Sequence, residues 1–122
     1  MATRLTPNQR FPLTCRLAHS HEFDAVFDQS EARFSSASLL LLAKPNDLGF
    51  NRLGMIVSKK SIPRSVQRSR VKRRVREAFR KSLTGYLLGW DIVAMTRPKI
   101  NSRQDLTGYL QDAFATLAEK LK

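Results

Sequence analysis

The sequence SVQRSRVKRRVREAFRKSL, residues 65–83, predicts a long helix with one apolar side. At about 100° per residue, its apolar side chains fall on a single stripe, formed by Val71, Val75, Ala78 and Phe79. Such a stripe is stable only when a sheet or another helix covers it. The segment is therefore expected to be anchored in a packed domain and not to be a free basic tail.

Apolar runs on both sides of this helix have the length of β-strands. Residues 39–43 and 53–57 precede it, and the turn-forming residues between them predict that the two runs pair as an antiparallel hairpin. Residues 90–96 follow it as a third strand, which Pro98 closes. The chain is therefore expected to be a compact alternation of strands and helices.

Two further helices are expected near the ends of the chain. Residues 19–28 carry Phe23, Val26 and Phe27 at helical spacing. Towards the C-terminus an amphipathic helix is predicted, with Ser102 as its N-cap three residues before Asp105. Two prolines near the N-terminus argue against regular structure there, so we expect a flexible polar arm at residues 1–16 and a single domain at 17–122.

The chain of 122 residues has a formal net charge of +12, and nearly all of this excess lies in one segment. Residues 59–81 hold 11 of the 22 basic residues and only one of the 10 acidic residues, Glu77, so the segment has a net charge of +10. Such an excess repels itself unless an anionic partner neutralises it. A solvated helix face normally mixes acids with bases, so the pattern favours a phosphate-binding surface over an ordinary solvated face.

Basic side chains flank the apolar stripe on both sides: Lys72, Arg73, Arg76 and Arg80 on one, and Arg70, Arg74 and Lys81 on the other. Guanidinium groups match phosphate oxygens with two parallel hydrogen bonds and can also stack on bases. The segment is therefore predicted to be a preformed surface for nucleic acid.

Other features limit where the protein acts and what it does. The longest apolar run, residues 39–43, is far shorter than the roughly 20 residues of a membrane-spanning helix. The single cysteine, Cys15, suits a reducing compartment, so we expect the protein in the cytoplasm, with no membrane partner. His19 and His21 have no further ligand nearby for a metal, and the carboxylates are dispersed, so no metal site and no catalytic residue are expected in this chain.

Residues 68–80, RSRVKRRVREAFR, resemble the signature helix of the bacterial ribonuclease P protein subunit. The usual pattern there is Arg-Asn-Arg, any residue, Lys-Arg, two more residues, Arg-Glu and then an aromatic. Residues 52–60, RLGMIVSKK, resemble the family's strand that ends in Lys-Lys, residues 21–27 its first helix, and residues 90–94 its third conserved strand. Ser69 departs from the pattern, because serine replaces the usual Asn and its hydrogen-bonding group reaches less far.

The resemblance implies a two-layer α/β sandwich with a small mixed sheet and three helices, like the second domain of ribosomal protein S5. It also implies a left-handed β-α-β crossover through the basic helix. Physical reasoning alone predicts the opposite hand, since nearly all such crossovers are right-handed.

The resemblance further implies a ribonucleoprotein endonuclease that removes the 5′ leader from precursor tRNA. It implies that a catalytic RNA subunit holds the Mg²⁺ ions and that the protein binds this RNA one to one. The residues implied to contact RNA are Lys59, Lys60, Arg64, Arg68, Ser69, Arg70, Lys72, Arg73, Arg76 and Arg80. A cleft for the single-stranded leader is implied at Phe23, Phe27 and Leu41, although helical spacing alone favours core positions for the two phenylalanines.

Two other functions share the basic charge. A structural protein of the ribosomal type would also be a small basic α/β domain. A sequence-specific DNA regulator would need a helix-turn-helix or dimer element with base-reading residues, and the sequence contains neither. The pair Phe23 and Phe27 and the ordered basic helix favour the ribonuclease P hypothesis over these two alternatives.

Overall fold

The computed structural model describes residues 16–17, 19–83, 89–101 and 104–121. Its elements, in chain order, are α1 (Ser20–Gln29), β1 (Ala32–Ser35), β2 (Leu39–Pro45), β3 (Arg52–Ile56), α2 (Ser65–Leu83), β4 (Trp90–Thr96) and α3 (Thr107–Leu121). The predicted bounds of α2 and β4 are confirmed. Among the described residues, no helix is both long and apolar enough to cross a membrane.

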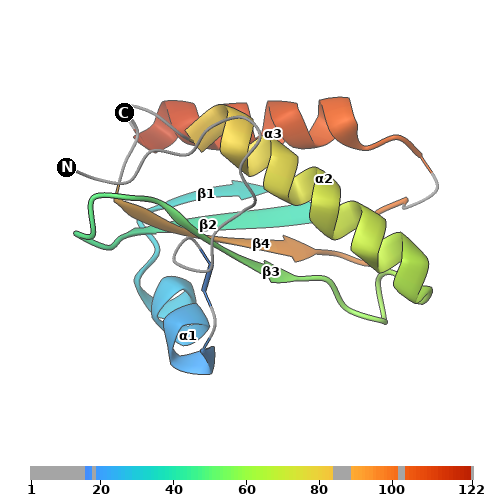
Figure 1. Cartoon of the computed structure of the whole chain (residues 1–122), viewed down its shortest axis with the longest axis horizontal. Coiled ribbons are helices and arrows are strands. Elements are labelled where there is room, and N and C mark those ends of the chain that lie inside the picture. The colour runs from blue at the N-terminus through green and yellow to red at the C-terminus, as the bar shows by residue number, and fades with distance from the viewer. Residues whose placement is uncertain (1–15, 18, 84–88, 102–103, 122) are drawn as a thin grey trace.

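The four strands form one mixed sheet in the order β1-β2-β4-β3. β2 runs antiparallel to both β1 and β4, whereas β3 runs parallel to β4. α2 joins β3 to β4 and so forms the β-α-β crossover (Figure 1). Sequence patterning missed β1, which is only 4 residues long and alternates between half-buried and exposed side chains.

The predicted hairpin between residues 39–43 and 53–57 is wrong, because β4 lies between β2 and β3. The residues that connect β2 to β3 do not close a hairpin but form hydrogen bonds with the start of β4. The Asn46 amide donates to the carbonyl of Gly89 over 2.8 Å. The Trp90 amide donates to Oδ1 of Asn51 over 2.9 Å. The turn residues thus hold the β2–β3 connection against β4.

The larger core lies between the sheet and the pair α2 and α3, which cover the same face of the sheet (Figure 1). The predicted stripe of α2 is confirmed as buried there, and the rings of Phe79 and Phe114 meet edge to face with centroids 6.4 Å apart. The sheet contributes alternate residues to this core, namely Leu39, Leu41, Ala43, Leu53, Ile92 and Ala94. The basic helix is therefore fixed by a continuous apolar seam, and its charged sides are held in place.

The opposite face of the sheet packs against α1 (Figure 1). Leu40, Leu42 and Val93 point to this side and pack with Val26 of α1. Both faces of β2 are covered, which is why four leucines follow one another along it.

α3 begins later than the sequence suggested. Its first residue is Thr107, whose amide donates to Oδ1 of Asp105 over 3.0 Å. The predicted N-cap, Ser102, lies outside the described residues. The buried side of α3 confirms the predicted amphipathic pattern, with Leu110, Phe114 and Leu117 fully inside.

Candidate nucleic-acid interface

A tight turn between β3 and α2 displays the two lysines that end the RLGMIVSKK motif. The Ile62 amide donates to the carbonyl of Ser58 over 2.9 Å, and the Ser61 amide donates to the Ser58 hydroxyl over 3.1 Å. Burial of Ile62 in the main core anchors the turn. Lys59 and Lys60 are consequently exposed on a backbone that is fixed from both sides.

Arg68 ties this turn to the first turns of α2. Its Nη1 donates to the carbonyls of Ile62 and Pro63 over 3.0 and 2.7 Å. The side chain is half-buried, whereas Arg64, directly before the helix, is exposed. Arg68 thus has a structural role in addition to the RNA contact expected of it.

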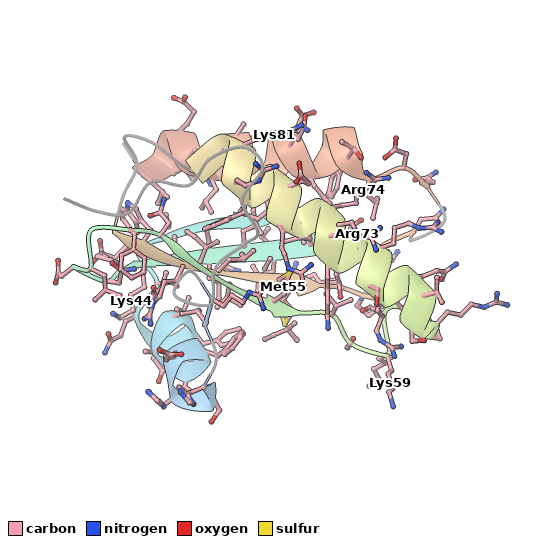
Figure 2. All side chains as sticks on the ribbon, in the orientation of Figure 1. Lys44, Met55, Lys59, Arg73, Arg74 and Lys81 are labelled. Atoms are coloured by element: carbon pink, nitrogen blue, oxygen red, sulfur yellow. The ribbon has the colours of Figure 1, made fainter. Side chains whose placement is uncertain are left out.

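The basic side chains of α2 divide into the two flanks that the helical spacing predicts. Arg70, Arg73, Arg74 and Lys81 are exposed, as is Ser69, while Lys72, Arg76 and Arg80 are half-buried. Figure 2 shows Arg73, Arg74 and Lys81 spread along α2, with Lys59 beyond the start of the helix. The structure therefore places the predicted RNA-contacting residues on one helix and on the turn before it.

The two flanks have different surroundings. On the flank that carries Arg76, burial lowers the pKa of the Arg76 guanidinium, and the charges of Arg16 and Arg73 lower it further. On the other, Arg74 lies near the start of α3, where its charge adds to the effect of the Thr107 hydrogen bonds that hold the pKa of Asp105 below its usual range. We call the side with Lys72, Arg73, Arg76 and Arg80 the inner flank and the side with Arg70, Arg74 and Lys81 the outer flank.

One charge of the inner flank is partly neutralised within the helix. Nη2 of Arg80 lies 2.6 Å from Oε2 of Glu77, three residues earlier. Glu77 is the only acid in residues 59–81, so the rest of this segment keeps its positive excess for an external anion.

The α1 side of the sheet presents one aromatic ring to solvent. Phe27 is 40% exposed, whereas Phe23 is half-buried over the backbone of Gly54. A Cβ on Gly54 would lie 2.5 Å from Cε1 of Phe23, so only glycine lets this ring rest on β3. The two phenylalanines thus differ, with Phe23 packed against the sheet and Phe27 available for contact.

The assignment of Leu41 to this side is wrong. Leu41 is 0% exposed and belongs to the core between the sheet and the pair α2 and α3. Side chains along a strand alternate between faces, so its neighbours Leu40 and Leu42 point towards α1. The surface that β2 presents to α1 is therefore formed by Leu40 and Leu42.

An ionic network that was not predicted, in which Asp91 is buried and Arg52 and Glu22 are half-buried, holds α1 on the sheet. Nε and Nη2 of Arg52 donate to the two carboxylate oxygens of Asp91 over 2.8 and 2.7 Å. Nη1 of Arg52 donates to Glu22 of α1 over 2.8 Å, and Asn46 donates to Asp91 over 2.7 Å. The hydrogen bond to Asp91 is the largest cause of the raised pKa of Arg52. Arg52 therefore fixes the position of α1, and with it the position of Phe23 and Phe27.

Comparison with known proteins identifies the family of this chain. The family model described as Ribonuclease P matches residues 11–122. The chain belongs to the ribonuclease P protein family. A curated relative from Ectopseudomonas mendocina, a ribonuclease P protein component, is 39% identical over 106 residues, which cover 87% of this chain and 77% of the relative.

Solved ribonuclease P proteins have the same fold. The protein from Thermotoga maritima superposes with a TM-score of 0.71 at 26% identity, over 88% of this chain and 97% of the other. The protein from Staphylococcus aureus gives a TM-score of 0.71 at 23% identity, over 88% of this chain and 95% of the other. These similarities, together with the mixed four-stranded sheet and three helices, confirm the fold that the resemblance implied.

The described part of this ribonuclease P protein offers no metal site of its own. No three side chains of His, Cys, Asp or Glu gather there in a way that could hold a metal ion. His19 and His21 stack with ring centroids 5.5 Å apart at the start of α1, without further ligands around them.

Proposed function

We propose that this chain is the protein subunit of ribonuclease P and that it binds the catalytic RNA through α2 and the preceding turn. The observation that carries this proposal is the rigid array of cations on α2, held by a buried apolar seam in a protein of this family. RNA phosphates repeat along a backbone, and arginine forks at fixed spacing can follow such a path.

On the opposite side of the sheet, the protein holds the single-stranded 5′ leader of precursor tRNA. The exposed ring of Phe27 offers a stacking surface, and Phe23 supports the helix beneath it. Single-stranded RNA is commonly held by aromatic stacking beside a basic groove. The leader and the catalytic RNA then occupy opposite faces of one small domain.

In this assignment the protein acts by binding, and the hydrolysis of the phosphodiester bond belongs to the RNA. Mg²⁺ held by the RNA subunit would supply the activation of water and the stabilisation of the leaving oxygen, and no residue of this chain takes that role. This chain contributes cations that lower the repulsion between catalytic RNA and precursor tRNA, in a one-to-one complex in the cytoplasm.

The test is cleavage of a 5′-extended precursor tRNA by a bacterial ribonuclease P RNA at low Mg²⁺, with and without the protein. We expect the protein to restore accurate cleavage and to cleave nothing alone. Cleavage by the protein alone would overturn the assignment of catalysis to RNA. Tight RNA binding without any gain in cleavage would instead favour a structural protein of the ribosomal type.

Replacing Phe27 with alanine is expected to weaken binding of precursor tRNA to the holoenzyme about tenfold, since one stacked base contributes roughly 1 to 3 kcal/mol. Binding of mature tRNA, which has no leader, should not change. The measurement is the ratio of the two dissociation constants. Leu48→Ala is the matched control, because Leu48 is also an exposed apolar residue but lies in the β2–β3 connection, outside α1 and α2. Equal weakening of precursor and mature tRNA would contradict leader stacking.

A further inference from the structure

A buried hydroxyl lies on the face of β4 that otherwise carries apolar side chains. Ile92 and Ala94 point from this face into the core between the sheet and the pair α2 and α3, and Thr96 is the next residue on the same side. Thr96 is only 5% exposed. Burying a hydroxyl costs free energy unless it is hydrogen-bonded, and valine would fill nearly the same space without that cost. The hydroxyl of Thr96 therefore calls for a partner.

That partner is the turn between β3 and α2, which lies 35 positions earlier in the sequence. Oγ of Ser61 lies 2.7 Å from Oγ1 of Thr96, and Oγ of Ser58 lies 2.9 Å from Oγ of Ser61. In one arrangement every hydroxyl donates once, with Ser58 donating to Ser61 and Ser61 to Thr96. Thr96 then donates to the carbonyl of Ile56, at the end of β3, over 3.4 Å. We call Ser58, Ser61 and Thr96 the hydroxyl chain.

The hydroxyl chain ties this turn to the sheet. Within the turn, the Ser61 amide donates to the Ser58 hydroxyl, and this bond alone would leave the turn free to move as a unit. The bond between Ser61 and Thr96 connects the turn to β4. Lys59 and Lys60 lie between the two serines and are exposed, and Lys59 extends from the turn into solvent (Figure 2). The backbone that carries both lysines is thus held at a fixed place relative to β4.

We propose that Thr96 is a positioning residue of the RNA interface, which holds the turn in the conformation in which Lys59 and Lys60 bind RNA. This step rests on the proposed function. A turn that is ordered before binding loses little conformational entropy when RNA binds, whereas a loose turn must be ordered at the expense of affinity. Because Thr96 is buried, its effect on RNA binding passes through the residues that it holds.

The test is a double-mutant cycle on the binding of ribonuclease P RNA by the full chain. Thr96→Val, which removes the hydroxyl and keeps the shape, should weaken binding about fivefold, the factor for one net hydrogen bond. In a chain that already carries Lys59→Gln and Lys60→Gln, the same substitution should weaken binding less than about twofold, because the lysines no longer contribute. Thr96→Ser keeps the hydroxyl and should bind within about twofold of the wild-type protein.

Tyr109→Phe is the matched control for this cycle. The Tyr109 hydroxyl bonds to that of Ser36, so it also links a turn, the one between β1 and β2, to another element. That turn carries no residue of the predicted RNA-contacting set, so the control should change RNA affinity by less than about twofold in either lysine background. Equal effects of Thr96→Val in both backgrounds would overturn the proposal, because a general loss of stability does not depend on the two lysines.

A measurement without RNA separates this inference from the proposed function. Hydrogen exchange of the Ser61 and Ile62 amides should be about fivefold faster in Thr96→Val, and that of the Leu110 amide in α3 should not change. Unchanged exchange in the turn would also overturn the proposal. Faster exchange in a protein that does not bind ribonuclease P RNA would refute the proposed function and leave Thr96 as the residue that orders the turn. If Thr96→Val does not fold, Ser61→Ala breaks the same chain and replaces it in both experiments.

Discussion

Replacing Arg52 with methionine will lower the free energy of unfolding by about 3 to 5 kcal/mol, the range for removing one partner of a buried ion pair. Asp91 is only 4% exposed and would lose two hydrogen bonds from Arg52, which leaves, among the described residues, the one from Asn46. Glu22 of α1 would lose its ion pair with Arg52 at the same time. Urea denaturation of the purified variant, followed by circular dichroism, measures the change.

The control for this experiment is Arg33→Met, the same substitution at an exposed position, which should change stability by less than about 0.5 kcal/mol. The double variant Arg52→Met with Asp91→Leu should recover much of the loss, because no buried charge then remains unpaired. If Arg52→Met costs less than about 1 kcal/mol, the network does not hold α1 in place.

Neutralising the inner flank will weaken binding of ribonuclease P RNA by on the order of 100-fold near physiological salt. The triple variant replaces Lys72, Arg73 and Arg76 with glutamine. Each lost phosphate contact should lower the slope of log affinity against log salt by about 0.7 to 0.9, so the slope should fall by about 2 to 3. Filter binding across a range of salt concentrations measures both quantities, and the loss should be similar for different RNA sequences because phosphates carry no sequence information.

The outer flank supplies a control of equal charge on the same helix. The triple variant of Arg70, Arg74 and Lys81 to glutamine removes the same number of charges from the side that faces α3. We expect a smaller decrease in salt slope, because Arg70 is the only one of the three in the predicted RNA-contacting set. Equal slopes in the two triple variants would show that RNA binding depends on total charge and not on the geometry of α2.

Local features of this fold could be predicted from the sequence, whereas pairings between distant segments could not. The bounds of α2 follow from a clear helical period and a run of strong helix formers, and β4 follows from an apolar run closed by Pro98. The hairpin prediction failed because local turn chemistry does not show that a third strand, 34 residues after β3 ends, will insert between two neighbours. Strand order depends on that long-range contact.

The candidate site likewise has features that could be predicted from the sequence and features that depend on distant contacts. The exposed cations of α2 follow from spacing, since one buried stripe determines which residues face outward. Leu41 was misplaced because four consecutive leucines give no alternation from which to tell the two faces apart. Arg52 had no distinguishing signal, because its role comes from partners on α1 and β4.

The central position of β4 has a consequence for how the protein is made. β2 and β3 are both complete by residue 56, yet each keeps an unpaired edge until residues 90–96 have been synthesised and inserted between them. Chains emerge from the ribosome from the N-terminus, and exposed strand edges favour aggregation. The nascent chain must therefore carry two open edges while residues 57–96 are synthesised, and α2 stays partly uncovered until α3 follows. Folding should be slower than that of a domain built from local contacts.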